Sequence, residues 1–255
     1  EGVSRRLDPS LADSERARQV DRTFASYARY WAESFRLPSL SPAQVDARFS
    51  MDGYGHIVDA REDGQGAIIA LPHLGGWEWA AFWLTAVEHV PVTAVVEALE
   101  PQELFEWFAD YRRDLGMTVV GLGPGAAQAC VRALRRREVL CLLSDRDIGG
   151  GGVEVEFFGE RTTLPAGPAT LALRTGAPIL PTAIYFDGAG HRAVVEAPLD
   201  TARQGNLRAD VARITQDLAV RLEGLIARAP EQWHLMSPNW PSDRAEIVAP
   251  STALP

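Results

Sequence analysis

The sequence contains no lysine, so each of its 25 basic residues is an arginine. This absence excludes a catalytic or Schiff-base lysine. Acidic residues outnumber basic ones, and the formal net charge is −9. Such a balance argues against a nucleic-acid partner, because nonspecific binding needs a basic surface to displace counterions from phosphates. Arginines still gather in two stretches, 16–36 and 132–137, so the chain could present a basic face to anionic lipid.

Cysteines and long apolar runs are also scarce. Cys130 and Cys141 are the only cysteines; they have no metal-ligand spacing and make no disulfide framework, which favours a reducing compartment. We expect neither a metal nor a redox cofactor. No run approaches the roughly 20 apolar residues that span a bilayer, and the first ten residues lack the apolar core of a signal peptide. The sequence therefore predicts a chain that does not cross a membrane.

The apolar residues follow two patterns, a helical spacing and short continuous runs. Spacings of three and four between about residues 14 and 36 predict an amphipathic helix within an N-terminal segment, 1–40. Short apolar runs predict buried strands at 66–71, 92–96, 117–122, 139–143 and 178–186. Helical stretches follow these strands at 76–88, 101–115, 124–137, 165–174 and 207–229. This alternation predicts an α/β fold with a mostly parallel central sheet and helices on both faces.

The whole chain, 1–255, is expected to form one domain, because 46% of its residues are hydrophobic and no repeat or biased segment divides it. The Pro- and Trp-rich tail, 230–255, is expected to pack as extended structure.

The most distinctive local pattern is LPHLGGWE at 71–78, which places His73 just after a buried strand and Glu78 on the first turn of a helix. Strand ends are where such folds bind ligands. Histidine is suited to accept the hydroxyl proton that acyl transfer to an alcohol must remove, and a carboxylate can orient the ring. The alternative is that His73 only caps the helix, since an isolated His-x4-Glu is common by chance.

The residues between His73 and Glu78 fit the same hypothesis. Gly75 and Gly76 would let a substrate approach the backbone, and the N–H groups of the helix start could stabilise an oxyanion. Alternatively the two glycines only permit a turn. Trp77 begins an apolar stretch, 77–84, which could form the wall of an acyl-chain tunnel, although such stretches are more often core. The other histidines are interpreted as structural: His56, His89, His191 and His234.

Several segments in one order resemble bacterial lipid acyltransferases, the family that finishes lipid A and, in actinobacteria, acylates phosphatidylinositol mannosides. They are His73-x4-Glu78, VLCLLSDRD (139–147), GGGGVEVEFFGERTTLPAGPATLA (149–172) and PILP (178–181). The segments SYARYWAESFRLPS (26–39), LLSDRDIGGGGVEVEFFGE (142–160) and PEQWH (230–234) most resemble the members that act on phosphatidylinositol mannosides. The resemblance covers nearly the whole chain.

This resemblance implies the chemistry. His73 would be the general base for a mannose hydroxyl, and a long-chain acyl-CoA would be the donor in a direct attack without an acyl-enzyme. The family also pairs its histidine with a glutamate, for which Glu78 and Glu154 are the candidates. We favour Glu154 for the direct hydrogen bond and Glu78 for ordering the helix start. The alternative for Glu154 is an exposed position on the alternating strand VEVE.

Three further polar residues are expected to bind substrate. Asp145 and Arg146 end a buried strand, where the wider superfamily carries a Phe-Pro-Glu-Gly element, and would line the polar part of the pocket. Arg112, like its neighbour Arg113, could hold a phosphate of the donor or of the acceptor lipid. A solvated helix face is the alternative for both of these arginines.

The sequence thus favours an acyl-CoA-dependent O-acyltransferase bound peripherally at the cytoplasmic face of the cell membrane. Its partners would be acyl-CoA, a glycolipid acceptor and the inner-leaflet surface, with no nucleic acid. Two alternatives stay open: a lipid A-type or other lipid acyltransferase with a different acceptor, and a noncatalytic protein that binds acyl-CoA or lipid. A serine hydrolase is disfavoured, because no Gly-x-Ser-x-Gly motif occurs.

Overall fold

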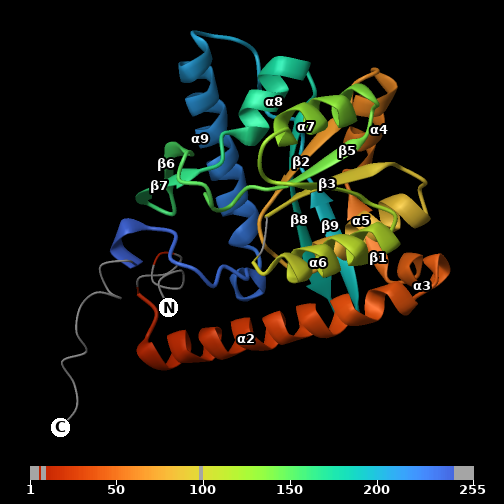
Figure 1. The fold of residues 1–255 in the computed structure, drawn as a ribbon. Helices are drawn as coiled ribbons and strands as arrows, with labels where there is room; N and C mark the ends of the chain where they lie inside the picture. The colour runs from red at the N-terminus through yellow and green to blue at the C-terminus, as the bar shows by residue number, and fades with distance from the viewer. Residues whose placement is uncertain (1–5, 7–9, 98–99, 244–255) are drawn as a thin grey trace.

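A seven-stranded sheet forms the centre of the computed structural model, which describes residues 6, 10–97 and 100–243 (Figure 1). Its strand order is β1-β9-β8-β2-β5-β3-β4. The strands are β1 Phe49–Asp52, β2 Ala67–Leu71, β3 Val92–Val96, β4 Thr118–Gly121, β5 Val139–Leu143, β8 Ile179–Asp187 and β9 Gly190–Val195. A separate antiparallel hairpin consists of β6 Val153–Phe157 and β7 Glu160–Leu164.

The main sheet is mostly parallel. Only the β8–β9 pair is antiparallel, whereas β2 pairs in parallel with both β5 and β8. The helices are α2 Asp13–Arg36, α3 Pro42–Asp46, α4 Tyr54–Glu62, α5 Trp77–Ala86, α6 Gln102–Asp114, α7 Ala126–Arg135, α8 Gly167–Thr175 and α9 Leu207–Ile226. The predicted α/β fold is confirmed, and the predicted strands and helices differ in their bounds from those observed by three residues or fewer. The strands β1 and β9 and the helices α3 and α4 were not predicted.

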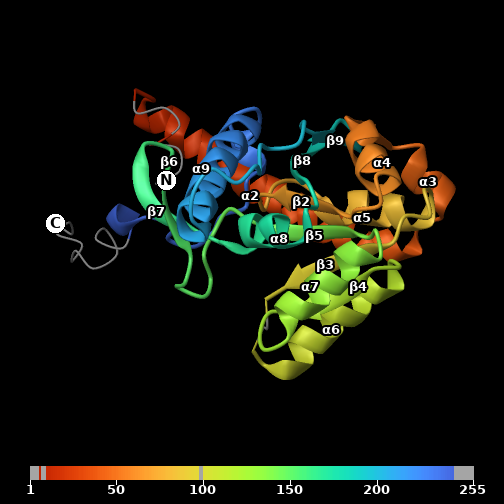
Figure 2. The same ribbon diagram turned by 90° about the horizontal axis from the view of Figure 1, so that it is seen from above.

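Helices cover both faces of the sheet, and the central strand β2 is therefore buried on both faces. Ile68 and Ala70 pack with residues of α7, α8 and α9, whereas Ala67 and Ile69 pack with residues of α4, α5 and α6. Side chains alternate along a strand, so a continuous apolar run serves two cores at once. Figure 2 shows α9 and the β6–β7 hairpin towards one end of the molecule and α3 and α4 towards the other.

Local signals explain where several helices begin and end. The Asn206 side chain accepts a hydrogen bond from the Ala209 N–H and caps α9. Ser41 and Gln44 form a capping box at α3. Gly176, with φ of +79°, ends α8 in the left-handed conformation that glycine tolerates best.

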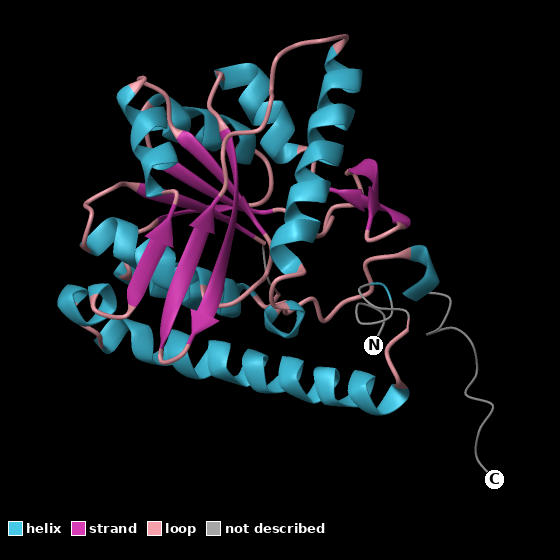
Figure 3. Cartoon of the chain, turned by 180° about the vertical axis from the view of Figure 1, so that it is seen from behind, coloured by secondary structure: helices cyan, strands magenta, loops and turns pink. Residues whose placement is uncertain are grey.

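The predicted amphipathic helix is α2, which runs across one edge of the sheet (Figures 1 and 3). The β8 arrow points towards this edge, so α2 lies near the carboxyl ends of the parallel strands. One side of α2 contacts the short 3-10 helix Pro230–Gln232, but Phe24 and Phe35 remain 61% exposed. Ligands of open α/β sheets bind at carboxyl strand ends, so α2 is placed to form part of a site.

The tail, expected to be extended, is irregular and includes short helical turns. Residues 230–232 form a 3-10 helix, residues 241–243 are helical, and Trp233 forms an isolated bridge with Leu74. The expectation is therefore wrong at 230–232 and 241–243, and residues 244–255 lie outside the described residues. Among the residues that the structure describes, no helix is both long and apolar enough to span a bilayer.

Candidate active site

The register between β2 and β5 brings His73 and Asp145 together. Leu71 pairs with Leu143, and the Ser144 N–H continues the ladder to the Leu71 carbonyl. Two residues beyond each strand end, the His73 Nδ1 lies 2.6 Å from Asp145 Oδ1, and the His73 backbone N–H donates to Oδ2 at 2.9 Å. Adjacent parallel strands therefore place an imidazole and a carboxylate in direct contact.

Asp145 is fully buried but well supplied with hydrogen-bond donors. Besides the two bonds from His73, Oδ2 accepts one from the Trp233 indole N–H at 2.7 Å. Burial alone raises the pKa of the carboxyl group, yet attraction to His73 and the hydrogen bonds from His73 and Trp233 lower it below the usual value. Asp145 is therefore an ionised acceptor.

The ionised carboxylate determines the tautomer of the histidine. Because Asp145 can only accept, Nδ1 of His73 carries the proton in this hydrogen bond. The lone pair of the neutral ring then lies on Nε2, which is the nitrogen left for a substrate. The His73 side chain is 25% exposed, whereas Asp145 is inaccessible. The pair has the arrangement of a general base and its orienting carboxylate.

His73 lies where two cavities meet. The larger, of about 440 Å³, is walled mainly by apolar residues at the ends of β3 and β5 and in the loop before α8. These include Val95, Val96, Leu122, Leu142, Leu143, Ile148, Pro165 and Pro168. The smaller, of about 280 Å³, is lined by Tyr27, Trp31, His234, Leu235, Met236 and Ser237. Both cavities share Tyr30, His73, Trp77 and Arg146.

Glu78 belongs to the wall of the site and does not hydrogen-bond His73. Its buried Oε1 accepts hydrogen bonds from the Tyr30 hydroxyl and from Arg112, each at 3.0 Å. Burial, and then the charge of Glu78, raise the pKa of Tyr30, so its hydroxyl stays protonated and donates. The Arg112 guanidinium also lies 5.1 Å from the centroid of the Trp77 ring. Glu78 thus joins α5 to α2 and α6.

Glu154 is placed elsewhere, and the expected hydrogen bond between Glu154 and His73 is wrong. The residue lies on β6 with its side chain 68% exposed, and it pairs with Arg161 at 3.0 Å. The alternation in VEVE turned its carboxylate to the outer face of the hairpin. Asp145, expected only to line the pocket, is the carboxylate that reaches the imidazole.

Gly75 and Gly76 are required by packing. A Cβ on Gly75, whose φ is +59°, would lie 1.9 Å from the Ile184 carbonyl oxygen. A Cβ on Gly76 would lie 2.7 Å from the His191 ring. Neither glycine lines the two cavities that meet at His73, and the Gly75 N–H already donates to the Gln232 carbonyl. The expectation that these glycines receive the substrate is therefore not supported by their positions.

Within the apolar stretch 77–84, only Trp77 lines the two cavities. Trp79 stacks on His191 with ring centroids 4.3 Å apart, and the Trp83 indole donates to Asp46 at 2.9 Å. The expected tunnel wall on this helix is wrong beyond its first residue, because the other side chains turn into the core. The apolar wall comes instead from neighbouring strand ends.

The expected arginines divide between the site and the surface. Arg146 lines both cavities and pairs with Glu97 at 2.9 Å. Arg112 lines the larger cavity, whereas Arg113 pairs with Asp110 on the exposed side of α6. Two cations therefore line the larger cavity. Within the described residues, no group of three or more His, Cys, Asp or Glu is arranged to hold a metal ion.

The contribution of the tail to the site was not predicted from the sequence. Trp233 hydrogen-bonds Asp145, and His234, interpreted as structural, lines the smaller cavity with its Nε2 2.9 Å from the Ser26 hydroxyl. Burial, followed by the nearby charge of His73, lowers the pKa of His234 to about 4. The motif PEQWH was the only signal for these residues, and it gave no contact partner.

The chain is similar in sequence to known acyltransferases. The family profile described as bacterial lipid A biosynthesis acyltransferase matches residues 7–242. A protein of Mycolicibacterium smegmatis (strain ATCC 700084 / mc(2)155) is 39% identical over 230 residues, covering 89% of this chain and 74% of the relative. A protein of Mycobacterium tuberculosis (strain CDC 1551 / Oshkosh) is 41% identical over 226 residues, covering 87% and 70% respectively. Both relatives are named phosphatidylinositol mannoside acyltransferase.

The two glutamates should differ in their effect on stability. Glu78→Gln leaves the buried Arg112 without its charged partner, and we expect the free energy of unfolding to fall by about 3 kcal/mol. The matched change Glu154→Gln removes an exposed ion pair and should cost less than about 1 kcal/mol. Urea unfolding of both variants measures the difference, and equal losses would contradict the burial assigned to Glu78.

His234 predicts a pH dependence of stability. Because its folded pKa is about 4 and an unfolded histidine titrates near 6.5, only the unfolded state binds this proton between those values. Stability should therefore fall as the pH decreases through this window. Relative to His234→Asn, the wild type should lose up to about 3 kcal/mol between pH 7 and pH 4. His89→Asn, at an exposed site, is the control; identical pH curves for all three proteins would refute the assignment.

Proposed function

The chain belongs to the bacterial lipid A biosynthesis acyltransferase family, and on this basis we propose that it transfers a long-chain, palmitoyl-like acyl group from acyl-CoA to a mannose hydroxyl of a phosphatidylinositol mannoside. The acceptor is taken from the names of the two mycobacterial relatives. The observation that carries the proposed chemistry is the 2.6 Å contact between His73 Nδ1 and buried Asp145, on a wall shared by two cavities.

In the proposed reaction, the acceptor hydroxyl oxygen attacks the thioester carbonyl carbon while Nε2 of His73 takes the hydroxyl proton. The new C–O bond gives a tetrahedral intermediate, whose collapse breaks the C–S bond. The departing thiolate of CoA takes the proton back from the imidazolium, leaving an ester and free CoA thiol. Asp145 stabilises the transient imidazolium through its hydrogen bond to Nδ1. No covalent acyl-enzyme is needed.

The volumes and lining residues of the two cavities support assigning the larger cavity to the acyl donor and the smaller one to the acceptor. The larger, mostly apolar cavity suits the acyl chain, each of whose methylenes contributes about 0.8 kcal/mol when buried. The smaller cavity offers Tyr27, Trp31 and His234, whose rings combine an apolar face with a polar edge and suit a sugar. Because His73 lines both cavities, a hydroxyl in one and a thioester at the mouth of the other would meet at its ring.

The two cations on these walls have proposed roles. Arg146 lines both cavities together with His73, which supports a role for its guanidinium in stabilising the negative charge that develops on the thioester oxygen. Arg112 lines the larger cavity and is held by Glu78, an arrangement that suits a phosphate of the donor or of the acceptor lipid. A planar guanidinium can bind such oxygens with two parallel hydrogen bonds.

We also propose peripheral binding at the cytoplasmic face of the cell membrane, through the exposed aromatic side of α2. Phe35 is 61% exposed and contacts Trp107 of α6, itself 48% exposed, with ring centroids 5.9 Å apart. Phe35 also contacts Trp31, which lines the smaller cavity. The arginines of α2 contribute less than their number suggests, since Arg18 and Arg22 both pair with Glu15. Apolar insertion therefore carries this proposal.

Activity is tested with palmitoyl-CoA and phosphatidylinositol mannoside, by measuring free CoA thiol and the mass of the acylated glycolipid. His73→Ala should lower kcat by about 10²- to 10⁴-fold, the range of general-base catalysis, while acyl-CoA binding persists. Glu154→Ala is the matched control and should keep wild-type kcat. Transfer only to a lipid A precursor would show that the proposed acceptor is wrong. Binding of acyl-CoA without turnover on any acceptor would indicate a lipid carrier.

Membrane binding is tested by flotation with vesicles containing phosphatidylinositol. Phe35→Asp should reduce the vesicle partition coefficient by about 30-fold, because a buried Phe side chain contributes about 2 kcal/mol. Val220→Asp is the control, since Val220 is 55% exposed on α9. Failure of the wild type to float, or equal losses in both variants, would refute binding through α2.

A further inference from the structure

We propose that Trp233 is a positioning residue that holds the carboxylate of Asp145 in line with His73. This inference rests on the proposed function, because it assigns a role to a residue that supports the general base. It also gives a purpose to the PEQWH segment, whose tryptophan lies 88 residues from Asp145 in the sequence.

The hydrogen bonds of Asp145 place Trp233 in this role. Oδ1 accepts from the His73 ring at 2.6 Å, while Oδ2 accepts from the Trp233 indole at 2.7 Å and from the His73 backbone at 2.9 Å. Trp233 is 2% exposed and Asp145 is inaccessible, so water cannot replace the indole donor. With donors on both oxygens, the carboxylate cannot rotate without breaking a buried hydrogen bond, and such a loss is costly.

The backbone around Trp233 is fixed to the same segment that carries His73. The His234 N–H donates to the His73 carbonyl at 2.7 Å, and the Gly75 N–H donates to the Gln232 carbonyl at 3.0 Å. Leu74 and Trp233 thus form an antiparallel bridge. The Gln232 side-chain oxygen accepts from the Phe186 N–H at the end of β8. The indole and the imidazole are therefore positioned by one short ladder.

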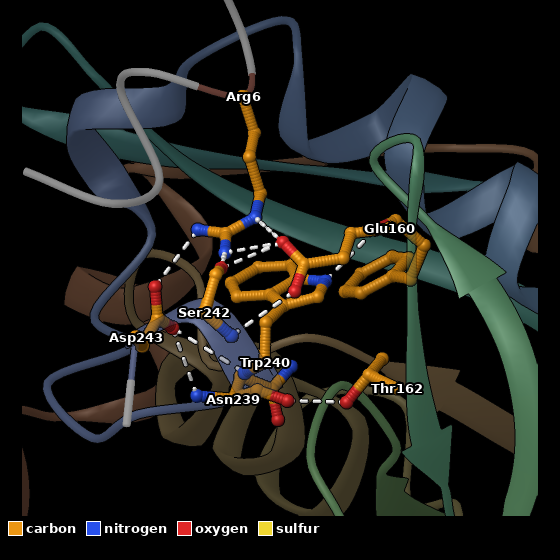
Figure 4. Close-up of polar contacts among 8 residues, drawn as sticks. Arg6, Glu160, Thr162, Asn239, Trp240, Ser242 and Asp243 are labelled. Atoms are coloured by element: carbon orange, nitrogen blue, oxygen red, sulfur yellow. Dashed lines mark hydrogen bonds and ion pairs between the residues drawn. The ribbon is translucent and has the colours of Figure 1, made fainter. Parts of the chain in front are cut away.

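Residues 239–243 of the tail are anchored as well. Asn239 donates to the Asp145 backbone carbonyl at 3.1 Å, so the tail contacts this residue at both its side chain and its main chain. Next to it, the Trp240 indole donates to the Phe157 carbonyl, and the Arg6 guanidinium lies 4.0 Å from the Trp240 ring centroid. Figure 4 shows Arg6 between Glu160 of the hairpin and Asp243 of the tail, to which it is ion-paired. The tail is thus held against β6 and β7 beyond the site.

A matched control separates positioning from packing. Trp83 is also a buried tryptophan whose indole donates to an aspartate, Asp46, at 2.9 Å, but it lies in the opposite core. Trp233→Phe and Trp83→Phe therefore remove the same atoms and the same kind of hydrogen bond. Only the first removes a donor from the carboxylate beside His73.

The experiment compares the steady-state kinetics of the two variants. Trp233→Phe should lower kcat about 10- to 100-fold, the range set by hydrogen bonds to charged groups, with both KM values changed less than about twofold. Without the indole donor, the pKa of Asp145 should be less strongly lowered, so the acid limb of kcat should move to higher pH. The groups with ionisable side chains around this contact are His73, which shares the proton, Arg146, which follows Asp145, and His234, which follows Trp233. They are present in both variants, so the two pH profiles are compared over one pH range. Trp83→Phe should keep the wild-type kcat and pH profile.

A second replacement covers the case in which Trp233→Phe does not fold. Benzothienylalanine has the shape of tryptophan without its N–H, so at position 233 it removes the donor and keeps the packing. The same replacement at position 83 is the control. A kcat equal to wild type in the folded position-233 protein would overturn the proposal.

A readout without substrate separates this proposal from the proposed function. The proton shared by His73 and Asp145 should give a low-field NMR resonance that His73→Ala abolishes. The position-233 replacement should shift this resonance, whereas the position-83 replacement should not. An inactive wild type with this shift refutes the acyltransferase proposal alone. An active wild type with no shift and no loss of kcat refutes the role of Trp233.

Discussion

The site depends on the pairing of β2 with β5. Because Leu71 lies opposite Leu143, the residues two positions beyond, His73 and Asp145, also lie opposite each other. This pairing buries the Asp145 carboxylate completely, and a buried charge is tolerated only with close partners. The imidazole and the backbone of His73 supply two of these partners. The same contacts therefore orient the imidazole of His73 and stabilise the charge of the Asp145 carboxylate.

Completing the shell around Asp145 brings distant parts of the chain together. Trp233 supplies the third donor to its side chain, and Asn239 satisfies its backbone carbonyl, so the tail must return to the carboxyl ends of the strands. The ladder between the tail and residues 73–75 then makes the tail part of the wall around His73. This explains why Trp233, Asn239 and Trp240 are buried although their segment has little regular secondary structure. Its polar groups are used at the site, as buried polar groups must be.

Glu78 shows how one short motif serves two purposes. His73 lies on the loop before α5, whereas Glu78 lies within the first turn of that helix and faces Tyr30 and Arg112. The glutamate therefore fixes α2 and α6 against α5, next to the histidine but without touching it. Because α2 also exposes Phe35, the same helix connects the wall of the cavities with the aromatic surface proposed to meet lipid.

Local patterns in the sequence determined most of the secondary structure and the position of His73. Five strands of the main sheet and most helices were predictable, because continuous apolar runs and the 3.6-residue repeat are properties of consecutive residues. The position of His73 after β2 followed from the same patterns, whereas β1, β9, α3 and α4 were not predicted. The alternation in VEVE also indicated the exposed position of Glu154 as one of two alternatives. Only the tertiary structure decided which carboxylate meets the imidazole, because strand order and register bring together His73 and Asp145, which are 72 residues apart. The packing of the tail then adds Trp233, 88 residues from Asp145. Such contacts depend on how separate elements pack, and no local pattern encodes that packing.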